Sequence, residues 1–247
     1  MADPLTGLVA VVTGASSGLG RRFASTLASR GALVVAGARR IERLRELADT
    51  NPRIRPVECD VTSDEDRQAL IDHAEGLGGV DVLVNNAGWA EPGPAVDLPL
   101  ASLRRTLEVD LTALFALSVL AAASMKGRGG SIINIASILG LVGSSPVHQS
   151  AYGAAKGGVV ALTRHLACEW ARDGVRVNAI APGWFPSELT EEMFDDESAA
   201  DWIRRNTPVG RPGRPEELDG ILLLLAGRES TYLTGQVIAV DGGWTAR

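Results

Sequence analysis

Residues 8–20 read LVAVVTGASSGLG, an apolar run that passes directly into a glycine-rich turn. The run Leu8–Val12 predicts a buried strand, and Arg21–Arg30, beyond the turn, has the spacing of a helix. A strand, a tight glycine turn and a helix N-terminus together form an anion site, because unpaired backbone N–H groups and the helix dipole face the phosphate. The stretch therefore predicts the phosphate-binding turn of a dinucleotide-binding fold.

Three glycines of this turn have distinct expected roles. Gly14 allows the chain to turn, Gly18 lets the backbone approach a pyrophosphate, and Gly20 lets the helix pack closely on the strand. The spacing is Gly-x-x-x-Gly-x-Gly rather than the commoner Gly-x-Gly-x-x-Gly, and such a turn can also be a plain connection. Its position between a strand and a helix favours cofactor binding. The cofactor-binding residues expected here are Gly14, Ser16, Ser17, Gly18, Leu19 and Gly20.

The rest of the chain continues this alternation of short apolar runs and helical segments. Such alternation predicts a parallel sheet covered on both faces, so we expect an α/β Rossmann fold with a doubly wound, seven-stranded parallel sheet in three αβα layers. The length suits one domain, residues 1–247. The expected strands are Leu8–Val12, Leu33–Ala36, Ile54–Val57, Val82–Val84, Ile132–Ile135, Val175–Ile180 and Gln236–Val240.

An irregular stretch, residues 181–214, interrupts the pattern after the sixth expected strand. It contains four prolines, and seven acidic residues lie between Glu188 and Asp201. A long insertion near a strand end is more often a functional lid than a linker. We therefore expect a substrate lid at about residues 184–207.

Composition narrows the class of protein. The 24 Lys and Arg against 30 Asp and Glu give a net charge of −6, and without a dense basic run we expect no nucleic-acid partner. Apolar stretches such as residues 220–227 fall short of the roughly 20 residues of a membrane span. Cys59 and Cys168 form no CxxC pair, so no disulfide or metal site is predicted. We expect a cytoplasmic protein without a membrane partner, since the N-terminus also lacks the pattern of a signal peptide.

Two arginines follow the second expected strand. An NAD site usually has a carboxylate there for the ribose 2′-hydroxyl, whereas an arginine accommodates the 2′-phosphate of NADP. Here the segment reads Ala36-Gly-Ala-Arg39-Arg40, without an acid. We expect Arg39 and Arg40 to bind this phosphate, so NADP is the predicted cofactor and NAD stays possible. The alternative is that both arginines simply begin a solvated helix.

A tyrosine and a lysine one helical turn apart supply candidate catalytic chemistry. Tyr152 and Lys156 have i, i+4 spacing, which places them on one face of a helix. A nearby ammonium favours the phenolate, so we expect Lys156 to lower the pKa of Tyr152 towards working pH. Tyr152 would then act as a general acid/base on an alcohol or ketone oxygen. Ser137, which follows the fifth expected strand, can hydrogen-bond the same oxygen.

Several motifs follow one another along essentially the whole chain. They are TGASSGLG at 13–20, CDVT at 59–62, NNAG at 85–88, Ser137 with Tyr152-x-x-x-Lys156, Pro182-Gly183, and tail segments at 210–218, 233–236 and 241–243. Together and in this order, they resemble the short-chain dehydrogenase/reductase family. The resemblance implies a Rossmann sheet of seven parallel strands, a nicotinamide cofactor, and a homotetramer or homodimer.

The resemblance also implies which residues meet the cofactor. Asp60 and Val61 would meet the adenine. The other residues that it places against the cofactor are Asn85, Ala87 and Gly88 along the cleft, Pro182 and Gly183 at the nicotinamide, and Lys156, next to Tyr152, at the nicotinamide ribose.

The chain departs from the family pattern at three positions. Asp110 stands where an asparagine usually holds a water that passes protons to the lysine, and helical spacing puts it on the apolar face. A buried carboxylate needs a partner, so we expect Asp110 to face that water and to steady the charged Lys156. Phe185 replaces a small β-branched residue and is expected to shape the nicotinamide pocket. Ser187 stands where a threonine often meets the carboxamide.

A substrate pocket is expected where the ends of the fourth to sixth strands meet the lid, since open α/β sheets bind ligands at the carboxyl ends of their strands. Met193, Phe194 and Trp202 would reach it from the lid. Apolar and aromatic walls with few polar groups suit a neutral or amphipathic carbonyl compound. The expected substrate residues are Trp89, Ser137, Leu139, His148, Gln149 and Trp184.

The sequence therefore predicts an NADP(H)-dependent oxidoreductase that interconverts a secondary alcohol and a ketone by hydride transfer. The predicted catalytic residues are Ser137, Tyr152, Lys156 and Asp110. Within this class, a 3-oxoacyl-thioester reductase and a sugar or polyol dehydrogenase are both compatible with the motifs. A non-catalytic sensor that binds the cofactor is the alternative outside the class, and Asp110 is the residue that favours it.

Overall fold

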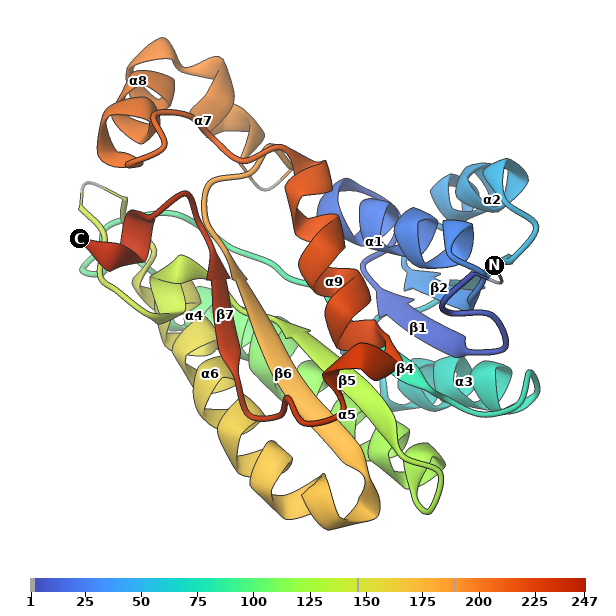
Figure 1. Ribbon diagram of the computed structural model, residues 1–247. Helices are drawn as coiled ribbons and strands as arrows, with labels where there is room; N and C mark the ends of the chain where they lie inside the picture. Colours follow the sequence, from blue (N-terminus) through green and yellow to red (C-terminus); the bar gives the residue numbers. More distant parts are fainter. Residues whose placement is uncertain (1–2, 146, 189) are drawn as a thin grey trace.

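Seven parallel strands form one sheet in the order β3-β2-β1-β4-β5-β6-β7 (Figure 1). This computed structural model describes residues 3–145, 147–188 and 190–247, so residues 1–2 of the expected domain and Leu189 of the expected lid lie outside the described residues. The strand order reverses between β1 and β4, the place where α/β sheets bind ligands. The predicted Rossmann fold is confirmed. The strands are β1 (Val9–Thr13), β2 (Leu33–Ala38), β3 (Ile54–Glu58), β4 (Val82–Asn85), β5 (Gly130–Ile135), β6 (Val175–Pro182) and β7 (Val237–Val240).

Six of the seven strands extend past an end of the predicted apolar run where a neighbouring strand supplies hydrogen bonds, whereas β7 begins one residue later than predicted, at Val237, and β1 begins at Val9 rather than Leu8. β5 starts at Gly130 because this residue pairs with Val175 of β6. β6 continues to Pro182, which pairs with Val240 of β7. The apolar runs mark the buried middle of each strand, whereas backbone pairing sets its ends.

Helices cover both faces of the sheet (Figure 1). On one face, α1, α2 and α9 contribute Phe23, Leu44 and Leu222 to one apolar core. On the other face, α3, α5 and α6 contribute Leu70 and Leu117, among others, to a second core. Burial of both faces explains why the strands read as continuous apolar runs. These helices are α1 (Gly18–Ser29), α2 (Ile41–Thr50), α3 (Asp64–Glu75), α5 (Ala113–Met125), α6 (Ser150–Trp170) and α9 (Asp219–Ala226).

The helix expected around Asp110 is longer and more apolar than its spacing indicated. α4 (Leu100–Leu107) and α5 are joined by a π-helical turn, Glu108–Thr112, into one helix of 26 residues. By length and composition this helix could cross a membrane, so the expectation that the apolar stretches fall short of a span was wrong. Packing within the fold explains why the helix is apolar, because α5 packs on β4, β5 and α3.

The expected lid contains two short helices, α7 (Glu191–Asp195) and α8 (Glu197–Asn206), which project beyond the carboxyl ends of the strands (Figure 1). Trp202 of α8 meets Trp184 edge-on, with 5.8 Å between ring centroids. Both indoles also pack on Trp244, at 5.2 and 5.5 Å. Three of the five tryptophans therefore form one cluster between the lid, the end of β6 and the C-terminal segment.

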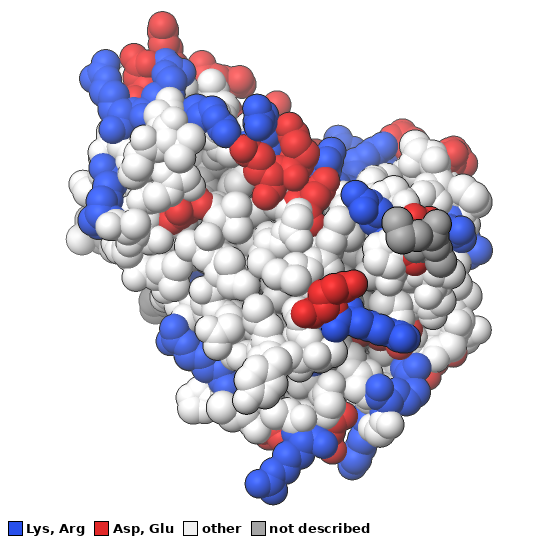
Figure 2. All heavy atoms as spheres, in the orientation of Figure 1, with Lys and Arg blue, Asp and Glu red and all other residues white. Residues whose placement is uncertain are grey.

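Charged side chains of both signs are interspersed on the face that Figure 2 shows, and the surface over β7 is largely uncharged there. Large apolar side chains are also exposed on two helices. Phe115 and Val119 of α5 are 44% and 42% exposed, and Leu224 of α9 is 40% exposed. Phe115 and Val119 lie one helical turn apart on α5, whereas Leu224 lies on the opposite face of the sheet. Of the three, the pair on α5 could belong to a protein contact surface.

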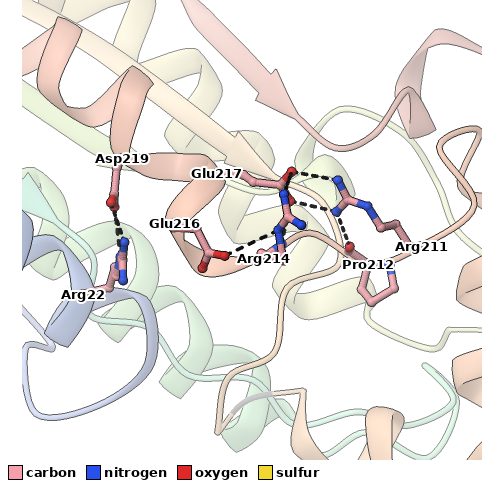
Figure 3. Close-up of polar contacts among 7 residues, drawn as sticks. All are labelled: Arg22, Arg211, Pro212, Arg214, Glu216, Glu217 and Asp219. Atoms are coloured by element: carbon pink, nitrogen blue, oxygen red, sulfur yellow. Dashed lines mark hydrogen bonds and ion pairs between the residues drawn. The ribbon is translucent and has the colours of Figure 1, made fainter.

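Ion pairs fix the segment that returns from the lid to the sheet (Figure 3). Arg211 donates to both carboxylate oxygens of Glu217 at 2.8 Å, and Arg214 reaches the same carboxylate at 3.3 Å. Asp219, at the start of α9, accepts hydrogen bonds from Arg22 of α1 at 2.6 and 3.1 Å. The far end of the lid is thereby tied to the helix that begins at the glycine turn.

Candidate active site

Two cavities meet at Tyr152 on the carboxyl edge of the sheet. The larger, of about 390 Å³, runs from the glycine turn past Asp60 to Lys156. The smaller, of about 110 Å³, lies between Ser137 and the lid. Leu19, Ile135, Tyr152 and Ser187 line both cavities. The phenol therefore lies where a ligand in one cavity would meet a ligand in the other.

The glycine turn has the geometry of a phosphate cradle. Gly14 and Gly18 have φ angles of +65° and +51°, which side-chain-bearing residues rarely adopt. A Cβ on Gly20 would lie 2.3 Å from the carbonyl oxygen of Gly14, so only glycine lets α1 approach the turn this closely. Ser17 is the N-cap of α1, yet its side chain accepts no hydrogen bond from the helix backbone. The N-terminus of α1 is thus open to an anion, and the residues fit a dinucleotide.

Arginine and aspartate side chains line the far end of the larger cavity. Arg39 and Arg40 both line it, and Arg40 donates to the Ser16 hydroxyl at 3.1 and 3.2 Å. Asp60 accepts hydrogen bonds from the N–H and the hydroxyl of Thr62, at 3.0 and 2.8 Å. These hydrogen bonds, together with the charge of Arg39, hold the pKa of Asp60 below its usual value. Cations thus gather where a 2′-phosphate would lie, and Asp60 stays ionised beside them.

Lys156 is held in a buried network behind the tyrosine. Its Nζ lies 3.0 Å from Oδ1 of Asp110 and donates to the carbonyl of Ile135 at 2.9 Å. The same Nζ lies 5.4 Å from the centroid of the Tyr152 ring. Ser137, at the end of β5, lines the smaller cavity opposite and accepts a hydrogen bond from Leu139 N at 3.1 Å. The structure brings together all four predicted catalytic residues.

The pKa of Tyr152 is raised above its ordinary value, contrary to the expected net decrease. Burial of the phenol is the main cause, and the Asp110 carboxylate adds to it, whereas Lys156 and the Ser137 hydroxyl act in the expected, lowering direction. Asp110 was expected to steady the charged Lys156, but not to raise the pKa of Tyr152. Burial alone would lower the pKa of Lys156, but Asp110 and Tyr152 outweigh it and the net shift is upward.

Asp110 lies in the π-helical turn between α4 and α5 and is fully buried. Its second oxygen, Oδ2, accepts the backbone N–H of Trp89 at 2.9 Å. A Cβ on Gly88 would lie 3.0 Å from Oδ1, so a side chain at this position would press on the carboxylate. The direct contact with Lys156 places Asp110 where it steadies the ammonium, as expected; the proposed water contact stays a prediction. π-Helical turns often occur at functional sites.

Most of the expected cofactor residues line one of the two cavities. Pro182, Gly183 and Phe185 line the smaller one. Gly20 lies behind the turn in the packing role expected of it. Those on the larger cavity are Gly14, Ser16, Ser17, Gly18, Leu19, Arg39, Arg40, Asp60, Val61, Ala87, Gly88, Tyr152, Lys156 and Ser187.

The expectation for Asn85 was wrong. Its side chain is buried and donates to the Ser118 hydroxyl at 2.9 Å and to Asn134 Oδ1 at 3.0 Å, so it links β4 to α5 and β5. Its neighbour Asn86 lines the larger cavity instead, and its amide donates to the carbonyl of Thr13 at 3.0 Å. Neighbouring residues of an extended chain point to opposite sides. Asn85, the last residue of β4, therefore points into the protein interior, and Asn86, the next residue, points to the cavity.

The smaller cavity contains four of the six expected substrate residues. Ser137, Leu139, Gln149 and Trp184 line it, and no charged side chain occurs among its described lining residues. Met193 reaches it from the lid, whereas Phe194 and Trp202 pack in the apolar cluster around Trp184 and Trp244 without lining it.

Two expected substrate residues lie elsewhere. Trp89 lines the larger cavity, where the guanidinium of Arg105 lies 4.4 Å from its ring centroid. His148 is exposed on a neighbouring surface depression. It lies in the loop two residues before α6 begins, so helical i, i+4 spacing does not place it on the face of Tyr152. Trp89 had been placed in the pocket because it follows the end of the fourth strand, and His148 because it precedes Tyr152 by four residues.

Sequence reasoning also missed residues that the fold brings to the cavities. Arg105 and Val109 reach the larger cavity from the long helix, and Thr190 reaches the smaller one. Glu188 lines the larger cavity although it belongs to the lid. Only Asn86, as part of the NNAG motif, carried a sequence signal.

Cys59 lines the larger cavity, and burial raises the pKa of its thiol to about 12, with Asp66 and Asp60 adding to the effect. A thiol with such a pKa stays protonated and is a poor nucleophile. Among the described residues, no three His, Cys, Asp or Glu side chains group as a metal site would need.

Comparisons with known proteins agree with this geometry. A family model described as enoyl-(acyl carrier protein) reductase matches residues 14–245. The chain is 42% identical to the cis-4-hydroxycyclohexanecarboxylate dehydrogenase of Sinomonas cyclohexanicum, and the alignment covers all of both chains. It is 38% identical to the 2-dehydro-3-deoxy-D-gluconate 5-dehydrogenase of Bacillus subtilis, with 98% of this chain and 96% of the relative covered.

A solved structure is similar over the whole chain. The gluconate 5-dehydrogenase from Burkholderia cenocepacia, in complex with NADP and tartrate, matches with a TM-score of 0.93 and 33% identity, covering 100% of this chain and 98% of that one. Fold and site together define a Rossmann-fold oxidoreductase that acts on alcohol or ketone groups. The chain belongs to the short-chain dehydrogenase/reductase family.

Proposed function

We propose that this protein is an NADP(H)-dependent oxidoreductase that interconverts a secondary alcohol and a ketone. The observation that carries the proposal is the position of Tyr152 at the junction of the two cavities, with Ser137 on one side and Lys156 on the other. NADP supplies or accepts the hydride when bound. The glycine turn would hold its pyrophosphate, Arg39 and Arg40 its 2′-phosphate, and Asp60 and Val61 its adenine.

Tyr152 is the group that exchanges the proton with the substrate oxygen. Because its pKa is raised, the phenol keeps its proton at neutral pH and can donate it to a carbonyl oxygen. Ser137 can hydrogen-bond the same oxygen and fix its orientation. Lys156, held by Asp110 and Ile135, places a positive charge behind the phenol and stabilises the phenolate that proton donation leaves.

The substrate class follows from the smaller cavity. Its described walls are apolar and aromatic, with Ser137, Gln149, Ser187 and Thr190 as polar side chains besides Tyr152. Such walls favour a compact, neutral or amphipathic ketone, for example a substituted cyclic one. The names of the relatives support two substrate classes, hydroxycyclohexanecarboxylates and sugar acids, so a sugar or polyol dehydrogenase is the second candidate.

A substrate screen tests the proposed function. Cyclic ketones, sugar acids, polyols and an acetoacetyl thioester are offered with NADPH and NADH in parallel, and the absorbance of the reduced cofactor is followed. We expect a compact cyclic ketone to be reduced fastest with NADPH. Turnover of the thioester alone would instead identify a 3-oxoacyl-thioester reductase. Tight NADPH binding without turnover of any compound would favour the non-catalytic sensor.

Arg39→Asp should move cofactor preference towards NAD. The carboxylate repels a 2′-phosphate and can accept hydrogen bonds from a ribose diol, so the ratio of kcat/KM for NADPH to that for NADH should fall at least tenfold. Arg53→Asp, an exposed position beside the start of β3, serves as the control. An unchanged ratio in Arg39→Asp would remove the 2′-phosphate assignment.

Asp110→Asn should shift the pH–rate profile to lower pH. Loss of the carboxylate leaves the charge of Lys156 uncompensated, which favours the phenolate and lowers the pKa of Tyr152. Alcohol oxidation needs the phenolate, so the rising limb of kcat against pH should move down by about one pH unit. Glu108→Gln, in the same helical turn, is the matched control. Identical profiles for Asp110→Asn and the wild type would show that Asp110 does not act on the acid/base pair.

The expected protein partner is a second copy of this chain, as the family resemblance implies. We propose a homo-oligomer, either a homotetramer or a homodimer, supported by the exposed apolar side chains of α5 and α9. A contact made through α5 would also cover the outer side of the long apolar helix. A cytoplasmic location, and the absence of nucleic-acid and membrane partners, remain predictions from composition.

A further inference from the structure

Glu188, in the lid segment that follows β6, is bound to the glycine turn and to helix α2. Its Oε2 accepts hydrogen bonds from the Ser17 hydroxyl at 2.8 Å and from Nη2 of Arg40 at 2.7 Å. Its Oε1 accepts from Nη1 of Arg40 at 3.1 Å and from Arg43. One carboxylate therefore engages two guanidinium groups and the N-cap serine of α1.

This set of donors is the set that a phosphate group would use. Guanidinium groups bind carboxylates and phosphates with the same forked geometry, and the N-terminus of α1 favours any anion. Arg40 also donates to Ser16 and Ser17, so the same guanidinium serves the turn and the lid. Glu188 lines the larger cavity together with Arg39 and Arg40. An anion entering this end of the cavity meets one arginine, Arg40, whose guanidinium already has a carboxylate partner.

Glu188 stays ionised at working pH, and its ion pairs with Arg40 and Arg43 are only half-buried. Hydrogen bonds from Arg40, Ser17 and Arg43 lower the pKa of Glu188 to about 2, so protonation at working pH does not release it. The side chains of Arg40, Arg43 and Glu188 are each 44–46% exposed. Salt and competing anions weaken exposed ion pairs, so a phosphate can displace this carboxylate.

We propose that Glu188 is an internal competitor for the 2′-phosphate of the cofactor, and thereby a determinant of selectivity between phosphorylated and unphosphorylated dinucleotides. The proposal rests on the proposed function. In the free protein Glu188 takes the place of the phosphate on Arg40, one of the two arginines expected to bind it, and its further contacts with Arg43 and Ser17 tie the lid to α2 and to the glycine turn. A 2′-phosphate must displace Glu188 from Arg40. NAD lacks that phosphate and leaves the contact largely intact.

Glu188→Gln tests the proposal by direct binding. The glutamine keeps the shape and removes the negative charge that repels the phosphate and occupies the arginines. Dissociation constants are measured by calorimetry on the full-length protein for NADPH, NADH, 2′,5′-ADP and 5′-AMP at low salt. We expect Kd for NADPH and 2′,5′-ADP to fall about tenfold, and Kd for NADH and 5′-AMP to change less than threefold. The gain should shrink as salt is raised.

Two further variants complete the design. Glu188→Ala removes the same carboxylate and should show the same selective gain in affinity for NADPH and 2′,5′-ADP. This result would show that loss of the carboxylate, rather than the new amide of glutamine, causes the gain. Glu191→Gln, an exposed lid carboxylate three residues along the chain, is the matched control and should leave all four constants unchanged.

The other outcomes overturn the inference. An equal gain for NADPH and NADH would show competition at the pyrophosphate, without selectivity. Unchanged constants would show a surface ion pair without influence on binding. Weaker NADPH binding would make Glu188 a cofactor ligand. If the wild-type protein binds NADPH, any of these results leaves the proposed function intact. If neither the wild type nor any variant binds a dinucleotide, both the inference on Glu188 and the proposed function are wrong.

Discussion

Tyr152→Phe is expected to lower kcat for ketone reduction by about 10²–10⁴, the range that general acid catalysis contributes. The variant keeps the ring, its packing and its distance to Lys156, and loses only the hydroxyl that exchanges the proton. The Kd for NADPH should stay within a few-fold of the wild-type value, because the larger cavity keeps its other lining residues. Steady-state kinetics and calorimetry on the same preparation separate the two effects.

The chain provides its own control for this variant. Tyr232 is the second of only two tyrosines and is fully exposed, so Tyr232→Phe should leave kcat unchanged. A Tyr152→Phe protein that keeps a tenth or more of the wild-type kcat would mean that another group delivers the proton. Ser137 would then be the next candidate, since it lines the same cavity.

Lys156→Met is expected to lower the free energy of unfolding by about 3–5 kcal/mol, the cost of leaving a buried charge without its partner. The side chains of Lys156 and Asp110 are 4% and 0% exposed, so water cannot replace the lost ammonium. Oδ1 of Asp110 would lose its ion pair, and only the contact of Oδ2 with Trp89 N would remain. Chemical denaturation followed by tryptophan fluorescence measures the change, and activity should be lost as well.

A double variant separates the ion pair from general packing. If the unpaired charge causes the loss, Asp110→Asn combined with Lys156→Met should recover most of the stability while activity stays lost. Lys126, the only other lysine of the chain, is exposed, so Lys126→Met should cost less than about 0.5 kcal/mol. Equal stabilities of Lys156→Met and the double variant would show that side-chain packing, rather than the buried charge, sets the loss.

Local patterns were enough to predict the strands and the glycine turn. A continuous apolar run of strand length is typical of a parallel strand covered on both faces and does not fit an exposed strand. The three glycines of the turn are required by the backbone geometry of a few neighbouring residues. The Tyr152–Lys156 pair was equally accessible, because both residues lie on one turn of α6. In each case the determining interactions act within about one helical turn or one strand.

The orientation of single side chains at element ends was less accessible. Asn85 and Asn86 are adjacent, and a one-residue difference in where β4 ends decides which of them faces the cavity. The prediction for His148 was wrong for a related reason. Because α6 begins only at Ser150, His148 lies in the preceding loop and not on the helix of Tyr152. Neither boundary has a pattern in the sequence that defines it to within one residue.

By itself, the sequence determined the fold class, the family and the pairing of Tyr152 with Lys156, because these depend on periodicity and on motifs read over short distances. Only the tertiary structure decided the electrostatics of the site. Asp110 meets Lys156 across 46 positions of the chain, and Glu188 meets Arg40 across 148. Both contacts depend on how the long helix and the lid return to the edge of the sheet. They determine the net charge beside the phenol and beside the expected phosphate. The family pattern suggested that Asp110 steadies Lys156, but no local pattern encodes the geometry of either contact.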